Sequence, residues 1–262
     1  MKKLLLILLC LPMIGFGQTY VPDDYGFSFE ENSYQYLISD NVNIRSAPST
    51  KASIISRLPI GSRLQIIEKS SQRYTYNNIS FPWYKVSFIL DNSEKIGYVA
   101  GGFIAQEYYI EDYDPVSIIF LSGLSKYYPD GEIACQIRVV KQHEEIDKIE
   151  YLPVESPDDA RDFNIFRNGA INKGIHIIRI SFRQASCAIQ KNETTFFFDN
   201  NKLYHIKTFS NMDLKTLGYS NGKIQLYEWK WVPSDIDDWN GGDYQKEIIE
   251  EYIWDGNKLK GF

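Results

Sequence analysis

The sequence predicts a mainly β protein, in which a small barrel is followed by a second antiparallel β-sheet domain. Three observations lead to this prediction. Aromatic residues make up 15% of the 262 residues, and these residue types are enriched in pleated, half-buried strands. Short runs of β-forming residues recur along the chain, separated by clusters of Asn, Ser, Pro and Gly. Several of these clusters have the composition of tight hairpin turns.

The first 17 residues have the organisation of a secretory signal peptide. Lys2 and Lys3 precede an apolar run over residues 4–16, and small residues stand at its end. This run is too short to cross the roughly 30 Å hydrocarbon core of a bilayer as a helix. We therefore expect cleavage before Gln18, export to the periplasm or the extracellular space, and no membrane insertion after cleavage.

The mature chain is acidic. Removal of residues 1–17 takes away two lysines and no acidic residue, so the formal net charge of −6 falls by two to −8. Affinity for nucleic acid and for anionic lipid comes largely from Lys and Arg side chains that neutralise phosphates. We therefore expect neither nucleic acid nor an anionic membrane surface as a partner.

Two cysteines, Cys135 and Cys187, remain in the mature chain. Disulfides form and persist in the oxidising compartments that exported proteins enter. We expect a Cys135–Cys187 disulfide, which would close a loop of about 50 residues and stabilise the fold by roughly 4 kcal/mol in the chain-entropy description. The alternative is two separate buried thiols that behave as small apolar residues.

Composition divides the mature chain into four segments. Residues 18–33 form a polar leader, residues 34–106 the barrel, residues 107–115 an acidic linker, and residues 116–262 a β-rich domain of unknown family. Within the last segment, residues 156–172 are the least strand-like and are expected to hold a long loop or a short helix. The barrel strands are expected at Val42–Arg45, Ile54–Leu58, Arg63–Glu68, Trp83–Leu90 and Lys95–Val99.

Turn signals in the second region favour consecutive antiparallel hairpins. Strand candidates lie between or beside these signals, an arrangement typical of a meander. No clear internal repeat is recognisable in the sequence. The turn signals are Asp130-Gly131, Asp199-Asn200-Asn201, Asn221-Gly222 and Asp255-Gly256-Asn257.

Four motifs follow one another in the first region. They are Asn41-Val-Asn-Ile-Arg-Ser-Ala-Pro-Ser-Thr50, Ile55-Ser-Arg-Leu-Pro-Ile-Gly-Ser-Arg-Leu-Gln-Ile-Ile67, Pro82-Trp-Tyr-Lys-Val86 and Ile96-Gly-Tyr-Val99. Through these motifs, residues 42–104 resemble the bacterial Src homology 3 (SH3) family. The chain departs from the family pattern in two places. Ala47 replaces the usual glycine, and Ser70–Phe81 is expected to be an expanded loop before Trp83.

The resemblance implies a non-catalytic module that, in cell-wall-targeting relatives, binds peptidoglycan or its cross-bridge peptides. Aromatic residues in and beside the expanded loop offer stacking faces for a sugar or an extended peptide. The alternative is that these rings fill the barrel core, cap the barrel or dock the two domains together. The candidate ligand-binding residues are Tyr74, Tyr76, Phe81, Trp83 and Tyr84.

Motifs for catalysis and metal binding are mostly missing from the sequence. Nothing near Cys187 suggests the base that an activated thiolate requires. The three histidines, His143, His176 and His205, have no recognised zinc-ligand spacing. We therefore assign no catalytic residue and expect no metal and no cofactor. The paired carboxylates of glycoside hydrolases are a spatial pattern that a sequence does not reveal.

These observations favour an exported, non-catalytic binding or adapter protein of the cell envelope. Its barrel would contact peptidoglycan, a glycan or a peptide, and the C-terminal domain would offer a second surface for a possible protein partner. Two alternatives stay open. One is a cell-wall or polysaccharide hydrolase with its active site in the C-terminal domain, and the other is a protein-binding inhibitor.

Overall fold

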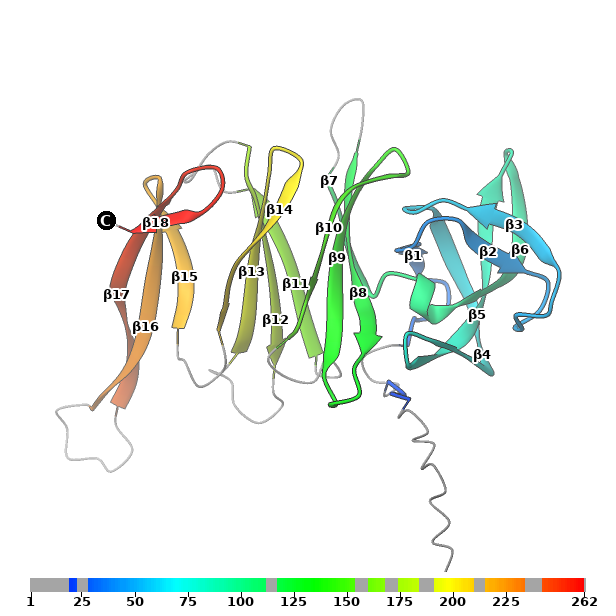
Figure 1. The fold of residues 1–262 in the computed structure, drawn as a ribbon, viewed down its shortest axis with the longest axis horizontal. Helices are drawn as coiled ribbons and strands as arrows, with labels where there is room; N and C mark the ends of the chain where they lie inside the picture. Colours follow the sequence, from blue (N-terminus) through cyan, green and yellow to red (C-terminus); the bar gives the residue numbers. More distant parts are fainter. Residues whose placement is uncertain are drawn as a thin grey trace, which may run out of the picture.

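The structure is a computed structural model that describes residues 19–22, 28–111, 117–153, 160–167, 174–183, 191–209, 215–233 and 242–261. These residues form four antiparallel sheets that follow one another along the chain (Figure 1). The predicted fold class, a small barrel followed by antiparallel sheet structure, is confirmed. The predicted signal peptide lies outside the described residues. In the described ranges, no helix has the length and apolarity to span a membrane.

The first sheet is six-stranded and curls into the barrel, with strand order β1-β4-β5-β6-β2-β3. Alternation along β2 points Val42 and Ile44 into the barrel core, where Leu64, Tyr84 and Val99 are also buried. A single 3₁₀ turn, η1 (Gly101–Phe103), ends the barrel. The strands are β1 (Tyr34–Tyr36), β2 (Val42–Arg45), β3 (Ile54–Leu58), β4 (Arg63–Tyr76), β5 (Ile79–Leu90) and β6 (Ser93–Ala100).

The segment Ser70–Phe81 is not the loop that we expected. It forms the distal part of a long hairpin, in which β4 pairs with β5 as far as Tyr76 and Ile79. Asn77 and Asn78 close this hairpin with φ angles of 48° and 63°, the backbone of a two-residue primed turn that suits strand twist. The added residues are absorbed as an irregularity in the pairing of β4, between Lys69 and Arg73.

Two glycines of the family motifs have physical explanations. Gly61 adopts a φ of +73°, a conformation that costs glycine little because it has no Cβ. At Gly97 of β6, an added Cβ would lie 2.5 Å from Cγ2 of Ile44 and 3.1 Å from the carbonyl oxygen of Arg45. Close approach of β6 to β2 therefore requires glycine at this position.

The rest of the chain forms three four-stranded meanders, here called the second, third and fourth sheets. The second sheet contains β7 (Glu107–Glu111), β8 (Ile118–Tyr127), β9 (Ile133–Lys141) and β10 (Glu144–Tyr151). The third contains β11 (Ala160–Arg167), β12 (His176–Arg183), β13 (Lys191–Asp199) and β14 (Lys202–Phe209). The fourth contains β15 (Lys215–Ser220), β16 (Lys223–Pro233), β17 (Gly242–Trp254) and β18 (Leu259–Gly261).

Two of these strands lie where no strand was expected. Residues 107–111 of the expected linker form β7, which pairs along its whole length with β8. Residues 160–167, inside the stretch expected to be a loop or a short helix, form β11 and pair with β12. The repeated four-stranded topology was likewise not apparent from the sequence.

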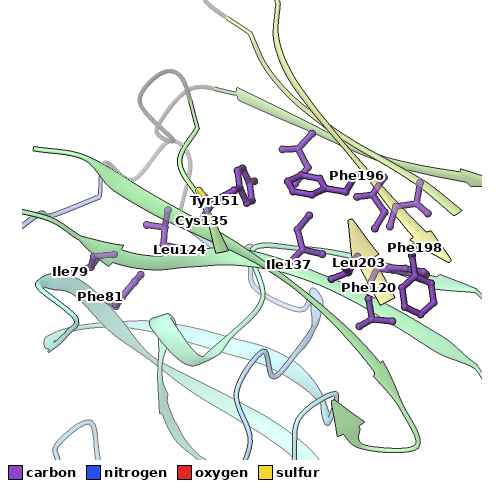
Figure 2. Packing of buried hydrophobic residues seen from close by; sticks show 14 residues of the cluster. Ile79, Phe81, Phe120, Leu124, Cys135, Ile137, Tyr151, Phe196, Phe198 and Leu203 are labelled. Atoms are coloured by element: carbon purple, nitrogen blue, oxygen red, sulfur yellow. The ribbon is translucent and has the colours of Figure 1, made fainter. Parts of the chain in front are cut away.

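The sheets are stacked, and apolar clusters fill the space between neighbours (Figures 1 and 2). One cluster joins the second and third sheets through residues such as Phe120, Ile137 and Phe196, and it also includes Ile79 and Phe81 of the barrel. Figure 2 shows two groups within this cluster. Ile79 and Phe81 lie near Leu124, and Phe120 lies near Phe198 and Leu203. Separate clusters join the third sheet to the fourth and the barrel to the second sheet.

The barrel is also fixed to the second sheet by hydrogen bonds at the tip of the β4–β5 hairpin. The side-chain amide of Asn77 donates to the carbonyl oxygen of Ser125 over 3.0 Å. The side-chain amide of Asn78 donates to the carbonyl oxygen of Tyr127 over 3.1 Å. In addition, the backbone N–H of Tyr127 donates to the carbonyl oxygen of Asn77 over 3.0 Å. The hairpin extension therefore serves as a docking element.

Leader residues contact the barrel as well. Tyr20 forms a parallel bridge with Ile79, and its ring stacks on Tyr127 at 5.5 Å between centroids. Phe29 packs edge-on against Tyr84, with ring centroids 5.0 Å apart. The leader thus covers both the hairpin tip and one side of the barrel core.

Candidate ligand-binding site

A small cleft of about 140 Å³ opens on the barrel surface beside β2, β4 and β5. This volume is below the roughly 300–1,000 Å³ of sites that enclose a drug-sized molecule, so the cleft suits one group of a larger ligand. Its lining residues are Asp40, Asn41, Val42, Asn43, Arg45, Thr50, Tyr74, Trp83, Ala100 and Phe103.

The lining follows from strand alternation. Side chains alternate between the two faces of β2. Because Val42 and Ile44 face the core, Asn43 and Arg45 face outward into the cleft. On β5, Tyr84 is fully buried in the barrel core, so the preceding Trp83 points to the opposite face of the strand. The strands β2 and β5, which are separated by β6 in the sheet, thus present an amide and a guanidinium on one side of the cleft and an indole on the other.

Aromatic rings form one wall of the cleft. The rings of Tyr74 and Trp83 have their centroids 5.9 Å apart and are tilted by 58°. Phe103 of η1 lies 5.9 Å from the Tyr74 ring and 5.3 Å from the Tyr76 ring. Tilted aromatic pairs at this separation are favourable. Trp83 is only 4% exposed, so the Tyr74 ring packs beside an indole that has little surface open to solvent.

Polar groups line the rest of the cleft, and neighbouring residues hold them. The guanidinium of Arg45 donates to the carbonyl oxygen of Ala52 over 2.8 Å. The side-chain oxygen of Asn43 accepts a hydrogen bond from Nε of Arg57 over 3.1 Å. The carboxylate of Asp40 accepts hydrogen bonds from the side-chain amide of Asn41 and from the backbone N–H of Ile60. The cleft therefore combines an aromatic wall with hydrogen-bonding groups and charges of both signs.

The five predicted ligand-binding residues separate into three environments. Tyr74 and Trp83 line the cleft. Tyr76 lies beside it, 41% exposed and in contact with Phe103. The structure therefore brings three of the five residues to one surface.

Phe81 and Tyr84 belong elsewhere. Phe81 is 5% exposed and packs in the cluster that joins the barrel to the second and third sheets, so it docks the two regions together. Tyr84 is a core residue of the barrel, and its hydroxyl accepts a hydrogen bond from the backbone N–H of Phe29 over 3.4 Å. In both positions the ring is covered by other parts of the chain, and neither ring lines the cleft.

Several lining residues were not among the sequence-based candidates. Phe103 follows two glycines after the last barrel strand, and Asn43 and Arg45 belong to the first family motif. Asn43 and Arg45 could have been found from the alternation along β2, because they point outward once Val42 and Ile44 are assigned to the core. Among the residues whose side chains are described, no three His, Cys, Asp or Glu are grouped so that they could hold a metal ion.

Comparison with known proteins agrees with this geometry. Residues 40–105 match the family described as the bacterial SH3 domain. The barrel is therefore a bacterial SH3 domain, and a domain of this family suggests a module that binds the cell wall or peptidoglycan. The match covers β2–β6, η1 and all the residues that line the cleft; it begins after β1 and ends before β7. No curated protein and no solved structure matches the chain.

Proposed function

We propose that the protein is an exported, non-catalytic binding protein of the cell envelope, whose barrel holds one unit of peptidoglycan, a glycan or a peptide in the cleft beside Tyr74 and Trp83. One observation carries this proposal: an aromatic wall and outward-facing polar groups of β2 meet in a single cleft of a bacterial SH3 domain. A tyrosine face that is partly open to solvent stacks on a sugar ring or an extended peptide without requiring net positive charge.

The charges in the cleft favour binding over hydrolysis. Glycoside hydrolysis uses two carboxyl groups about 5–9 Å apart, whereas Asp40 is the single carboxylate among the described residues that line the cleft. That carboxylate already accepts hydrogen bonds from Asn41 and from the backbone of Ile60. This arrangement is typical of a structural turn residue.

Export and a Cys135–Cys187 disulfide are part of the same proposal. Cys135 is buried in β9, in the cluster that faces the third sheet. Cys187 lies outside the described residues, in the connection between β12 and β13 of that third sheet. A bridge between them would join the second and third sheets covalently.

Binding to purified peptidoglycan tests the proposal. Tyr74→Ala and Tyr76→Ala are compared with wild type in a sedimentation assay, and Tyr34→Ala serves as the matched control. Tyr34 is 44% exposed on β1 and does not line the cleft. Loss of one stacking face corresponds to about 0.5–1.5 kcal/mol, so we expect Tyr74→Ala to weaken binding by about twofold to twelvefold and the control to bind like wild type.

Trp83 requires a different substitution. Because this ring is almost completely buried, alanine would leave a cavity and destabilise the barrel by about 3–5 kcal/mol. Trp83→Phe keeps an aromatic wall and is expected to bind more weakly without unfolding. Glycan strands freed of peptide and the separated stem peptides show which component is recognised. Absence of binding by the wild type, or unchanged binding by all three cleft variants, would exclude this site.

A further inference from the structure

A second and larger cleft lies between the third and fourth sheets, far along the chain from the barrel. Its volume is about 500 Å³, within the roughly 300–1,000 Å³ typical of small-molecule sites. It is bounded by β14 on one side and by β17, β18 and the turn between them on the other. The lining residues are Leu203, Tyr204, His205, Ile206, Lys207, Phe209, Leu217, Leu226, Tyr252, Trp254, Asn257, Lys258 and Leu259.

The cleft lies where the packing between the two sheets becomes incomplete. Ile177, Phe197 and Ile224 are completely buried in the cluster between the sheets. At the edge formed by β14, β17 and β18, the apolar residues Ile206, Tyr252 and Leu259 are only partly buried against this cluster. The edge strand β18 has just three residues, Leu259–Gly261, and so leaves much of β14 without a strand opposite. An apolar floor therefore remains accessible at this edge.

Trp254 forms a fixed wall of this cleft. Its indole N–H donates to a carboxylate oxygen of Asp199 over 2.9 Å, which satisfies the one polar group of the ring. The ring is held edge-on between Phe197, at 5.2 Å and 79°, and Tyr204, at 5.0 Å and 73°. An aromatic face that is already oriented loses little conformational entropy when a ligand stacks on it.

Two lysines line the same cleft, and neither has a carboxylate partner in the part of the chain that the structure describes. Lys207 extends from β14, and Lys258 stands in the turn before β18. Two lysines of the fourth sheet are paired by contrast: Lys223 with Glu251 at 2.7 Å, and Lys260 with Asp255 at 3.1 Å. No Asp or Glu is among the described lining residues. Two carboxylates contact the lining from outside it: Asp199 accepts the indole N–H of Trp254, and Asp255 accepts the backbone N–H of Lys258. The ammonium groups of Lys207 and Lys258 are therefore the cationic groups that a ligand in the cleft would meet.

His205 is among the lining residues, but its ring makes its contacts on the other side of the third sheet. Its ring packs against Phe196, which belongs to the cluster on the other side of the third sheet. Its Nε2 is 2.8 Å from the hydroxyl of Thr208, which in turn donates to Thr194. The imidazole therefore faces away from Trp254, and the cations of the cleft are the two lysines.

We infer that this cleft binds a small ligand that carries a carboxylate on a flat body with an apolar face. The body stacks on Trp254 and contacts the apolar floor, while the carboxylate pairs with Lys207 and Lys258. An acidic sugar, with its C–H face, and an aromatic acid share this chemistry. The inference is independent of the function proposed for the barrel, because it concerns a different sheet pair and different residues.

Calorimetric titration of the mature chain tests the inference with two pairs of probes. One pair is 2-naphthoate and its neutral amide, 2-naphthamide. The other is a disaccharide that ends in glucuronate and the same disaccharide ending in glucose. A carboxylate held by two ammonium groups is expected to give at least tenfold tighter binding of one acid than of its neutral counterpart. The pair that shows this preference identifies the source of the ligand.

The double variant Lys207→Gln/Lys258→Gln is expected to lose this preference. A matched control, Lys141→Gln/Lys148→Gln, removes the same charge from exposed positions of the second sheet and is expected to retain it. Equal affinity of wild type for acid and neutral probes, binding of neither acid, or retention of the preference by the cleft variant would each overturn the inference. The comparison of acid with neutral probe needs only the wild type, so it stands even where a variant does not fold.

Discussion

The imidazole of His176 in β12 and the carboxylate of Glu111 in β7 are in contact across the interface between the second and third sheets. Their side chains are 6% and 13% exposed. The His176 ring is also packed against Phe120 and Phe198, at 5.3 and 5.7 Å between centroids. A polar pair is thus enclosed beside aromatic rings at this interface, where a buried polar group without its partner destabilises the fold.

We expect Glu111→Ala to lower the free energy of unfolding by about 1–3 kcal/mol, because the substitution takes this partner away from a buried imidazole. Glu111→Gln keeps a hydrogen-bonding side chain of the same shape and is expected to lose less. Urea unfolding followed by tryptophan fluorescence measures both changes. An unfolding midpoint for Glu111→Ala equal to that of the wild type would show that the contact does not stabilise the interface.

Gly97→Ala is expected to destabilise the barrel by about 1–3 kcal/mol, the usual range for overpacking. The new methyl group would meet Cγ2 of Ile44 at 2.5 Å, a contact that requires β2 and β6 to move apart. Gly174→Ala is the matched control, since its Cβ would meet no described atom within 4 Å. Thermal unfolding of the two variants checks this. Similar midpoints for both would mean that the barrel accommodates the methyl group.

The tip of the β4–β5 hairpin provides a test of how the barrel is attached. In Asn77→Gly/Asn78→Gly the positive φ angles remain easy to adopt, but both side-chain hydrogen bonds to the second sheet are lost. We expect a loss of about 1–2 kcal/mol in total, with faster hydrogen exchange at the N–H of Tyr127. The equivalent turn of the third sheet, Asn200→Gly/Asn201→Gly, is the control. Equal exchange rates in wild type and in the Asn77 and Asn78 variant would contradict the docking role.

Asp255 is expected to titrate well below an ordinary aspartate. Hydrogen bonds from the backbone N–H groups of Lys258 and Asn257, followed by the Lys260 ammonium, lower the pKa of its carboxyl from 3.8 to about 2. Because the folded pKa lies below the unfolded one, this carboxylate stabilises the turn above pH 3.8, and the contribution is lost as the pH falls towards 2. The ¹³C shift of the Asp255 carboxyl, followed against pH, reports the midpoint, and a value near 3.8 would contradict the hydrogen-bonded turn.

The disulfide makes a separate prediction. Freshly exported protein, digested without reduction, is expected to yield a single cross-linked peptide that contains Cys135 and Cys187. Reduction of this disulfide is expected to lower the free energy of unfolding of the protein by about 2–4 kcal/mol. Peptide mapping that recovers both cysteines as thiols would contradict a covalent link between the two sheets.

Local patterns predicted the barrel well. The strands expected at Val42–Arg45 and Ile54–Leu58 have those bounds in the structure, since each run ends at residues that favour turns. The expected Asn221-Gly222 turn is also confirmed, with φ angles of 51° and 77°. By contrast, Gln142 and His143 adopt φ angles of 52° and 65° between β9 and β10. Their residue types are not turn signals, so the position of that turn was not predicted.

Local sequence patterns did not predict the order of the sheets in space. They also did not predict which candidate ligand-binding residues would line the cleft and which would be buried between sheets. Period-2 alternation on β5 places Ile79, Phe81 and Trp83 on one face. It does not say that the second sheet covers the first two and leaves Trp83 at a cleft. That outcome depends on contacts between residues far apart in the chain. Similarly, three meanders repeat one topology without a recognisable sequence repeat, because many apolar residues satisfy the same buried positions.

The stacking of the sheets sets the distance between the two clefts. Packed sheets lie about 10 Å apart, and the second and third sheets stand between the barrel and the larger cleft beyond β14. The stack therefore acts as a spacer, and each meander contributes one increment of length. A polymer that occupied both clefts would have to present its two recognised groups roughly 20–30 Å apart. Such a polymer would gain avidity only where its repeat matched that spacing.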